Sequence, residues 1–314
     1  MKSSLLLATF NGEKYIKEQL DSIRCQTKLP DEVIICDDCS NDDTKVIILQ
    51  YIEDHQLNAT WKFVENTVNV GFRNNFLKLM SLANYQVIFL SDQDDIWERN
   101  KIELMMKSHE IISNPAVIVS DVNQLVERKS RGEKIVSETI DDKIIFDKNN
   151  DLYQILFTQN NLKNRRPGWS FSFSKEFIPD ILNLLELSNS IFHDEAIWYI
   201  GLIQDRLFFL NRITGDWRKF SGSETTRSLS LSNLMDNNKK YFNHSISNLE
   251  ILSKLEMNEK YASIILNEIN LLIKRKNVIV NGCLLKGVQQ VLRGDRIKES
   301  LTDVVKCILI RFAH

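Results

Sequence analysis

The chain has 314 residues, and 43% of them are apolar, which suffices for one large domain with a sizeable core and a smaller appendage. The net charge of −2 gives no general attraction to nucleic acid, so no nucleic-acid partner is expected. No apolar run approaches the ~18 residues of a membrane-spanning helix, and the N-terminal residues do not have the pattern of a signal peptide. We therefore expect a cytoplasmic protein.

The first part of the chain repeats one pattern, in which a short apolar run ends abruptly in polar or acidic residues. The four runs are residues 5–7, 33–36, 87–90 and 117–119. Continuous apolar runs are typical of parallel strands that are covered on both faces. Helical spacing follows the first run, at Ile16, Leu20 and Ile23. The pattern predicts an α/β fold with a mostly parallel sheet, flanked by helices and joined by right-handed crossovers.

The strand-like pattern weakens after residue 120. Residues 121–150 are polar and predict a hairpin or a loop, whereas residues 170–174 read as a strand after a turn. Helical stretches then surround residues 193–195. We expect a domain over residues 1–225, divided into a nucleotide-binding half at about 1–122 and an acceptor-binding half at about 123–225.

The remaining segment, residues 226–314, has no strand-like run and predicts an all-helical subdomain. Ile265, Ile269 and Leu272 have helical spacing, and so do the apolar residues between 297 and 312. We expect the last helix to dock on the main domain, with another subunit or a membrane surface as the alternatives. Basic residues on this helix keep peripheral contact with the inner face of a membrane open.

Three carboxylates, Asp92, Asp94 and Asp95, follow the apolar run at 87–90. Ligands of parallel sheets bind beyond the carboxyl ends of the strands, so these acids lie where a ligand would. Crowded carboxylates repel one another unless a cation neutralises them, and Mg²⁺ or Mn²⁺ prefers such oxygen ligands. The alternative is a solvated loop in which Asp94 or Asp95 caps a helix beginning near Trp97.

Two other acidic sites are candidates for function. Asp37 and Asp38 end the second strand, where one could accept a hydrogen bond from a nucleobase, or both could be turn and cap residues beside Asp42. Asp194 could act as a general base toward a hydroxyl, although an acid in the first turn of a helix also favours the helix dipole.

The five cysteines indicate neither a disulfide framework nor a zinc site. Their number is odd, and no second pair follows the C-x-x-C of Cys36 and Cys39. We interpret these two cysteines as a strand-end residue and a turn residue.

Five segments together resemble the glycosyltransferase family 2 proteins, in particular the bacterial rhamnosyltransferase-like members that build surface glycans. Each segment is only moderately specific, but their order is that of the family, and the resemblance covers roughly residues 3–225. The segments are ATFNGEKY (8–15), EQLDSI (18–23), DDCSND (37–42), NVGFRNNF (69–76) and FLSDQDDIW (89–97).

The resemblance implies a GT-A fold, a Rossmann-like nucleotide-diphospho-sugar transferase, and a role for each matching residue. The donor and nucleotide positions are Thr9, Asn11, Asp38, Asn75, Asp92, Asp95 and Arg218. The acceptor and sugar positions are Gly168, Trp169 and Glu195, with the Trp169 ring suited to the C–H face of a sugar. Asp92 and Asp94 match the D-x-D pair that binds Mn²⁺ or Mg²⁺, with Asp94 as a direct ligand. Asp194 matches the catalytic base.

The sequence departs from the family at two places. Cys39 stands where the family usually has glycine, so a cysteine must adopt the geometry of that turn, or the turn differs. Phe220 stands where relatives often carry the histidine of an Arg-x-His, so a histidine metal ligand is not expected. Arg218 remains available for the diphosphate or for a structural ion pair.

The implied activity is inverting, metal-dependent transfer of a hexose to a hydroxyl of a growing surface glycan, either a capsule or cell-wall polysaccharide or a glycoprotein O-glycan. UDP-sugars are favoured as donors, and dTDP-rhamnose is the alternative. The rival functions are a nucleotidyltransferase and a catalytically weak subunit that binds a partner glycosyltransferase. The C-terminal helices would serve a homo-oligomer or such a partner.

Overall fold

The structure is a computed structural model that describes residues 1–126, 140, 142–162, 166–219 and 231–280. Contacts between residues divide the chain into two compact units, Met1–Phe220 and Ser221–His314. Each unit is described below by itself.

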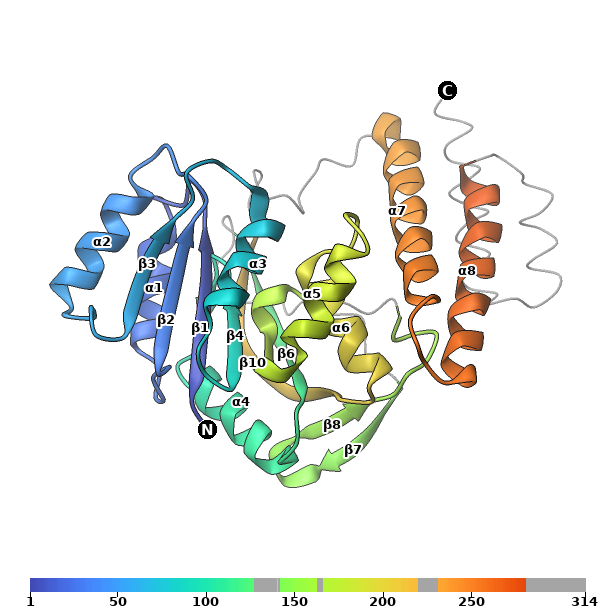
Figure 1. The fold of residues 1–314 in the computed structure, drawn as a ribbon, viewed down its shortest axis with the longest axis horizontal. Helices are drawn as coiled ribbons and strands as arrows, with labels where there is room; N and C mark the ends of the chain where they lie inside the picture. The colour runs from blue at the N-terminus through green and yellow to red at the C-terminus, as the bar shows by residue number, and fades with distance from the viewer. Residues whose placement is uncertain (127–139, 141, 163–165, 220–230, 281–314) are drawn as a thin grey trace. The chain divides into compact units, whose positions relative to one another are not determined.

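The first unit is built on one mixed sheet (Figure 1). Its first strands are β1 (Ser3–Thr9), β2 (Glu32–Asp37), β3 (Trp61–Glu65), β4 (Val87–Ser91) and β5 (Ile96–Trp97). The later strands are β6 (Val117–Val126), β7 (Lys143–Asp147), β8 (Leu152–Ile155), β9 (Phe171–Ser174) and β10 (Leu207–Lys219). The order is β3-β2-β1-β4-β9-β6-β10-β8-β7, and β5 pairs with β10. The four strands β3, β2, β1 and β4 are parallel, whereas β9 runs antiparallel to both β4 and β6.

Helices cover both faces of the sheet, which explains the continuous apolar runs. Alternate strand residues such as Leu5 and Leu7 share one core with α1 (Ile16–Arg24), α2 (Thr44–Asp54) and α4 (Lys101–Ile112). The other face is covered by α3 (Gly71–Leu82), α5 (Ile178–Glu186) and α6 (His193–Ile203), as Figure 1 shows. Leu5, Leu6 and Leu7 are all fully buried, because the helical layers exclude water from both sides.

The sequence predicts the parallel core well and the edges less well. All four apolar runs are strands, and 171–174 is β9. Within the polar segment 121–150 lies β7, which forms a hairpin with β8 just beyond that segment. The alternative prediction of a helix that begins near Trp97 is wrong, because residues 96–97 form β5 and α4 begins at Lys101. The strands β3 and β10 were not predicted from the sequence.

The second unit contains α7 (Leu231–Leu252) and α8 (Glu259–Ile279), which pack against each other. The predicted stripe of Ile265, Ile269 and Leu272 is buried in α8. Asn258 caps α8 by accepting a hydrogen bond from the Tyr261 backbone N–H at 2.9 Å. The helix predicted over 297–312 lies outside the described residues. Within the described residues, no helix is long and apolar enough to cross a membrane.

Candidate active site

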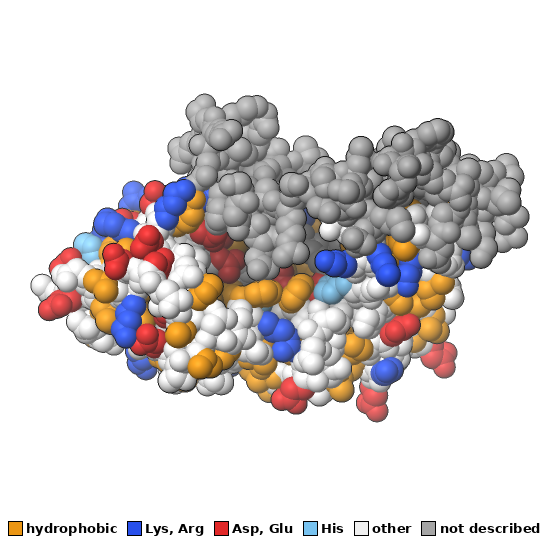
Figure 2. Space-filling model, turned by 90° about the horizontal axis from the view of Figure 1, so that it is seen from above, with side chains coloured by type: hydrophobic (Ala, Val, Ile, Leu, Met, Phe, Trp, Pro, Cys, Tyr) orange, Lys and Arg blue, Asp and Glu red, His pale blue; other side chains and the backbone are white. Residues whose placement is uncertain are grey.

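Three loops meet at one edge of the sheet because β1, β2 and β4 are parallel neighbours. Their carboxyl ends deliver residues 10–12, 38–42 and 92–95 to that edge. Figure 2 looks down on the molecule from above and shows acidic side chains there, bordered by apolar ones. The candidate site is therefore placed by the topology of the sheet.

Asp92 and Asp94 follow directly after β4, and both are only partly exposed. Burial, followed by the negative charges of Asp94 and Asp194, raises the pKa of Asp92 to about 7. Burial also raises the pKa of Asp94, although the Arg218 charge opposes the shift. Carboxylates from β4 and from α6 therefore lie close enough to repel one another, even though they are far apart in the chain.

The residues present fit a hard divalent cation. Within the described residues, no group of three or more His, Cys, Asp or Glu side chains is arranged to hold a metal. Mg²⁺ commonly binds through only one or two carboxylates and completes its shell with phosphate oxygens and water. Asp92 and Asp94 offer that donor set, and a cation there would offset both the burial and the repulsion that raise the pKa of Asp92.

Arg218 ties β10 to the acidic loop. Its backbone N–H donates to Asp95 Oδ1 at 3.1 Å, and its Nε donates to the Asp94 carbonyl at 3.0 Å. The guanidinium also forms an ion pair with Glu18 and lies 4.7 Å from the centre of the Tyr15 ring. The structure thus places Arg218 beside the acids and already bound to protein groups, and a diphosphate contact stays a prediction.

A buried lysine lies beneath the acidic loop. Lys101 is fully buried, its Nζ donates to Thr214 Oγ1 at 3.0 Å, and it lies about 5 Å from the ring centres of Trp97 and Trp169. Burial lowers the pKa of Lys101 to about 7, although the Asp95 charge acts in the opposite direction. Asp95 is itself only 2% exposed, and burial with its acidic neighbours raises its pKa well above the usual range.

The prediction that Trp169 offers its ring to a sugar is wrong. The side chain is 1% exposed and packs beside Lys101 and against Gly215, where an added Cβ would lie 2.7 Å from the ring. Sequence position alone could not distinguish a ring that faces a sugar from one that supports the floor of the site.

The loop after β2, for which a nucleoside contact is predicted, is organised by Asp38. Its carboxylate accepts hydrogen bonds from Asn66 Nδ2 at 2.8 Å and from the backbone N–H groups of Val70 and Gly71 at 2.9 and 2.8 Å. These bonds hold the loop that leads into α3. Thr9 donates its hydroxyl to Asp37 at 2.7 Å, and its carbonyl accepts the Asp38 N–H at 2.8 Å.

Asn11 and Cys39 line the same edge in left-handed conformations. Asn11 has φ 49° and accepts the Asn41 N–H at 2.8 Å, which joins the loops after β1 and β2. Cys39 has φ 63°, so the cysteine does adopt the turn geometry for which glycine is usual. Cys36 is buried within β2, so the two cysteines are a strand residue and a turn residue, as predicted.

Asn75 lies below the surface of this edge. It is 1% exposed, donates from Nδ2 to the Cys36 carbonyl at 2.8 Å, and accepts from Asn66 at 3.1 Å. Because its amide is used within the core, the prediction of a direct nucleotide contact is corrected. Asn75 instead supports the loop that Asp38 holds.

The first turn of α6 carries the candidate base. Asp194 is half-buried, and its carboxylate accepts the Glu195 N–H at 2.9 Å. Glu195 is 2% exposed and accepts the Phe192 N–H at 3.1 Å, which makes it a helix cap rather than the predicted acceptor contact. Gly168 lies against this turn, since a Cβ there would be 3.4 Å from Asp194 Cβ.

Sequence reasoning missed Arg73, which ties α3 to the connection before α6. Its guanidinium donates to the carbonyls of Leu185, Ser188 and Ile191, around the carboxyl end of α5. This tether connects the helix that Asp38 holds to the helix that carries Asp194. The one sequence feature that could have pointed to Arg73 is its position within the segment 69–76, which matches the family.

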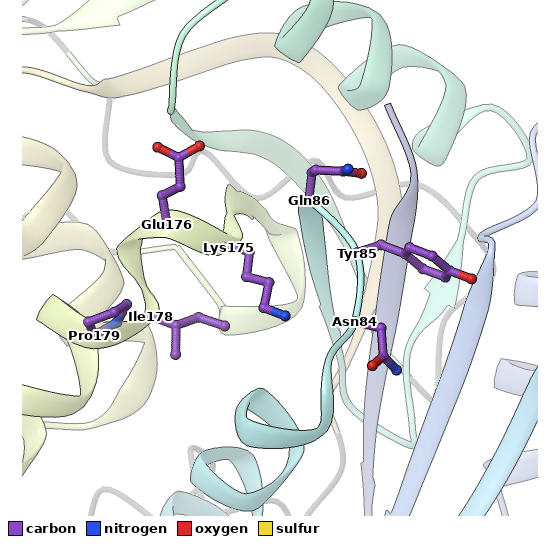
Figure 3. Close-up of a pocket in the computed structure, with 7 residues that line it drawn as sticks. All are labelled: Asn84, Tyr85, Gln86, Lys175, Glu176, Ile178 and Pro179. Atoms are coloured by element: carbon purple, nitrogen blue, oxygen red, sulfur yellow. The ribbon is translucent and has the colours of Figure 1, made fainter.

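A cavity of about 350 Å³ lies elsewhere, at the opposite edge of the sheet (Figure 3). It lies at the amino end of β4, where β9 ends, whereas the acids follow the carboxyl end of β4. Its lining is Asn84, Tyr85, Gln86, Lys175, Glu176, Ile178 and Pro179. Nothing in this lining matches the chemistry of the acidic site.

The fold and the site together define a class of α/β protein with paired carboxylates at the carboxyl edge of a mixed sheet, where ligands of such sheets bind. The family model "Glycosyl transferase family 2" matches residues 4–172, more than half of the chain. The chain belongs to glycosyltransferase family 2.

Several curated relatives are named for sugar transfer in bacteria. The chain is 40% identical over 105 residues to the dTDP-rhamnosyl transferase RfbG of Shigella flexneri, covering 31% of this chain and 34% of that protein. It is 25% identical over 234 residues to a GalNAc(5)-diNAcBac-PP-undecaprenol beta-1,3-glucosyltransferase of Campylobacter jejuni, covering 72% and 67%. With the first relatives, the chain matches less than half of their length.

Solved structures confirm the GT-A fold. S. aureus TarS 1–349 in complex with UDP-GlcNAc matches with a TM-score of 0.54 at 15% identity, covering 97% of this chain and 90% of that chain. The mannosyltransferase PcManGT from Pyrobaculum calidifontis, in complex with GDP-Man and Mn²⁺, matches with a TM-score of 0.53 at 14% identity, covering 98% and 84%. The predicted fold class is therefore confirmed, including the C-terminal helices.

Proposed function

We propose that this protein transfers a hexose, with inversion, from a nucleoside-diphosphate sugar to a hydroxyl of a growing bacterial surface glycan. One observation carries the proposal: the fold brings Asp194 of α6 near the acids after β4, so that its charge and that of Asp94 add to the effect of burial on the pKa of Asp92. A pair of acids for a cation and a separate acid for a hydroxyl proton are the groups that such a transfer requires.

The chain's own residues supply the acid–base chemistry and the positioning. Asp194 accepts the proton of the acceptor hydroxyl, and the oxygen attacks the anomeric carbon on the face opposite the leaving nucleoside diphosphate. A divalent cation held by Asp92 and Asp94 would supply positive charge for the leaving diphosphate. The nucleoside would bind at the edge formed by the loops that Thr9, Asn11 and Asp38 hold together; the side chains of Thr9 and Asp38 are themselves buried and bonded to protein groups.

Asp95 and Arg218 join the donor site in this proposal. The Arg218 N–H donates to Asp95, and its guanidinium donates to the Asp94 carbonyl. These two hydrogen bonds fix the acidic loop that is proposed to bind the cation. On the acceptor side, Gly168 keeps the first turn of α6 close to the segment beneath it. UDP-sugars are the favoured donors and dTDP-rhamnose the alternative; relatives named for UDP-glucose and for dTDP-rhamnose support both.

For the acceptor, we propose a surface glycan assembled at the inner face of the membrane. Two relatives are named for transfer onto glycans linked to a diphosphoundecaprenol or PP-undecaprenol carrier, which supports a lipid-linked acceptor. A glycoprotein O-glycan is the other acceptor consistent with the same chemistry. We further propose that the C-terminal helices mediate assembly with a second copy or with a partner glycosyltransferase.

Donor hydrolysis by the purified protein tests this function. UDP-glucose, UDP-galactose, UDP-N-acetylglucosamine and dTDP-rhamnose are incubated with Mn²⁺, and release of UDP or dTDP is measured. We expect one donor to be hydrolysed, and we expect EDTA or Asp94→Ala to stop the release. If no donor is hydrolysed and none binds in the presence of Mn²⁺, the proposed function is wrong.

A further inference from the structure

The side chain of Gln93 connects the loop after β4 to the loop after β1. The Phe10 N–H donates to Gln93 Oε1 at 2.8 Å, and Gln93 Nε2 donates to the Phe10 carbonyl at 2.9 Å. One amide group thus satisfies both backbone groups of a single residue, as a neighbouring strand would. The ladder between β1 and β4 ends at Leu7 and Ser91, so this pair adds one more connection beyond the last rung.

Gly12 makes room for this connection. A Cβ at Gly12 would lie 2.2 Å from Gln93 Oε1 and 2.5 Å from its Cδ, far inside van der Waals contact. Among the described glycines, only Gly71 has a positive φ, so the backbone of Gly12 would accept an alanine. A side chain at position 12 would therefore displace the Gln93 amide from Phe10, whereas the turn itself would tolerate it.

The connection lies between the two halves of the proposed donor site. Gln93 is flanked in sequence by Asp92 and Asp94, which are proposed to hold the cation. Phe10 is flanked by Thr9 and Asn11, which join the loops after β1 and β2 at the proposed nucleoside side. Fixing Phe10 to Gln93 therefore fixes the spacing between the groups that hold the nucleoside and those that hold the metal-bound diphosphate.

We propose that Gln93 is a positioning residue that sets this spacing, an inference that rests on the proposed function. A ligand that spans both halves, such as a nucleoside diphosphate with Mn²⁺, needs the connection. A nucleoside alone occupies one half and does not. Loss of the Gln93 amide should therefore weaken binding of the nucleoside diphosphate with Mn²⁺ and leave binding of the nucleoside unchanged. Loss of a residue needed only for folding would weaken binding of both ligands equally.

The test measures binding of UDP and dTDP, each with Mn²⁺, and of uridine and thymidine, to the full chain by calorimetry. Gln93→Ala should lower the affinity for the nucleoside diphosphate with Mn²⁺ about tenfold, as expected for two lost hydrogen bonds, and change the affinity for the nucleoside by less than twofold. The matched control is Gln50→Ala, because Gln50 on α2 bonds only locally, to Asp54 at 2.7 Å. This control should bind all ligands as the wild type does.

A double-mutant cycle with Gly12→Ala tests the contact itself. Alanine at position 12 should weaken diphosphate binding and lower the melting temperature in the wild-type background, but should do neither in the Gln93→Ala background. Equal effects of Gly12→Ala in both backgrounds would overturn the inference, and so would unchanged diphosphate affinity in Gln93→Ala. If the wild type binds no nucleotide, the proposed function fails and the inference fails with it. The melting cycle would still show whether the two side chains conflict.

Discussion

Replacing Asp92 by asparagine is expected to make the metal-free protein more stable. The pKa of this carboxyl rises from 3.8 to about 7, first through burial and then through the charges of Asp94 and Asp194. A rise of that size corresponds to about 4 kcal/mol of unfavourable interaction in the ionised form. Because Asp92 is partly exposed, solvent screening reduces this value, and we expect a gain of about 2 kcal/mol, or roughly 4–8 °C in melting temperature.

The pH dependence of this gain follows from the raised pKa. Between about pH 7 and pH 4, the folded wild type holds a proton on Asp92 that the unfolded chain has released. This contribution to the stability of the wild type therefore grows as the pH falls through that window. The advantage of Asp92→Asn should be largest near pH 8 and should shrink toward pH 5.

Thermal melts in EDTA, followed by circular dichroism at about pH 8 and about pH 5, provide the assay. The matched control is Asp42→Asn, which should change stability in the opposite direction. Burial acts to raise the pKa of Asp42, but hydrogen bonds from Thr44 and from the Glu13 N–H outweigh it and lower the pKa. Losing these bonds should cost about 1 kcal/mol at pH 8.

Added Mn²⁺ should stabilise the wild type and leave the melting temperature of Asp92→Asn unchanged, because the variant lacks one of the two proposed ligands. A lower melting temperature for Asp92→Asn at pH 8 in EDTA would refute the reasoning. The same holds if the gain persists unchanged at pH 5.

Three further predictions concern the base, the tether and a buried histidine. Asp194→Asn should reduce sugar transfer by about 10²–10⁴-fold while donor affinity, measured by calorimetry, stays within twofold; near wild-type transfer would exclude Asp194 as the base. Arg73→Lys keeps the charge but loses the planar fork that reaches three carbonyls, so kcat should fall about tenfold with little change in donor KM; a change in KM alone would contradict this. Burial lowers the pKa of His109 to about 3, so only the unfolded chain gains its proton below about pH 6.5, and stability is lost as the pH falls. Urea denaturation at several pH values gives the free energy of unfolding as a function of pH. Between pH 6 and 4, this free energy should fall less steeply for His109→Leu than for the wild type, by about 1.4 kcal/mol per pH unit, and equal pH dependences would contradict the assignment.

The parallel core could be predicted because its signals are local. Leu5–Leu7 and residues 87–90 are apolar without interruption, and in the fold each is buried on both faces. The acids after β4 could be located for the same reason, because they follow the apolar run of the strand directly in the sequence. β10 was missed because it lies in a segment that the sequence analysis assigned only to the acceptor-binding half.

The roles that failed depend on burial, which the sequence does not encode locally. Trp169, Glu195 and Asn75 all stand at positions next to the site, but each is at most 2% exposed. Thr9 and Asp38 are as deeply buried and bond to protein groups, so they support the loops of the site. Conversely, Arg73 and Gln93 act through backbone groups of distant segments, which carry no side-chain signature. Such contacts become visible only when the strands are assembled.

The most direct test of the central claim is the anomeric configuration of the first product. Slow hydrolysis of the α-linked UDP-sugar that the donor screen identifies, followed by proton NMR before the free sugar equilibrates, needs no knowledge of the acceptor. Attack from the face opposite the diphosphate predicts the β-anomer as the first sugar released, with Mn²⁺ required and Asp194→Asn strongly impaired. Release of the α-anomer first would contradict single-displacement transfer at this site.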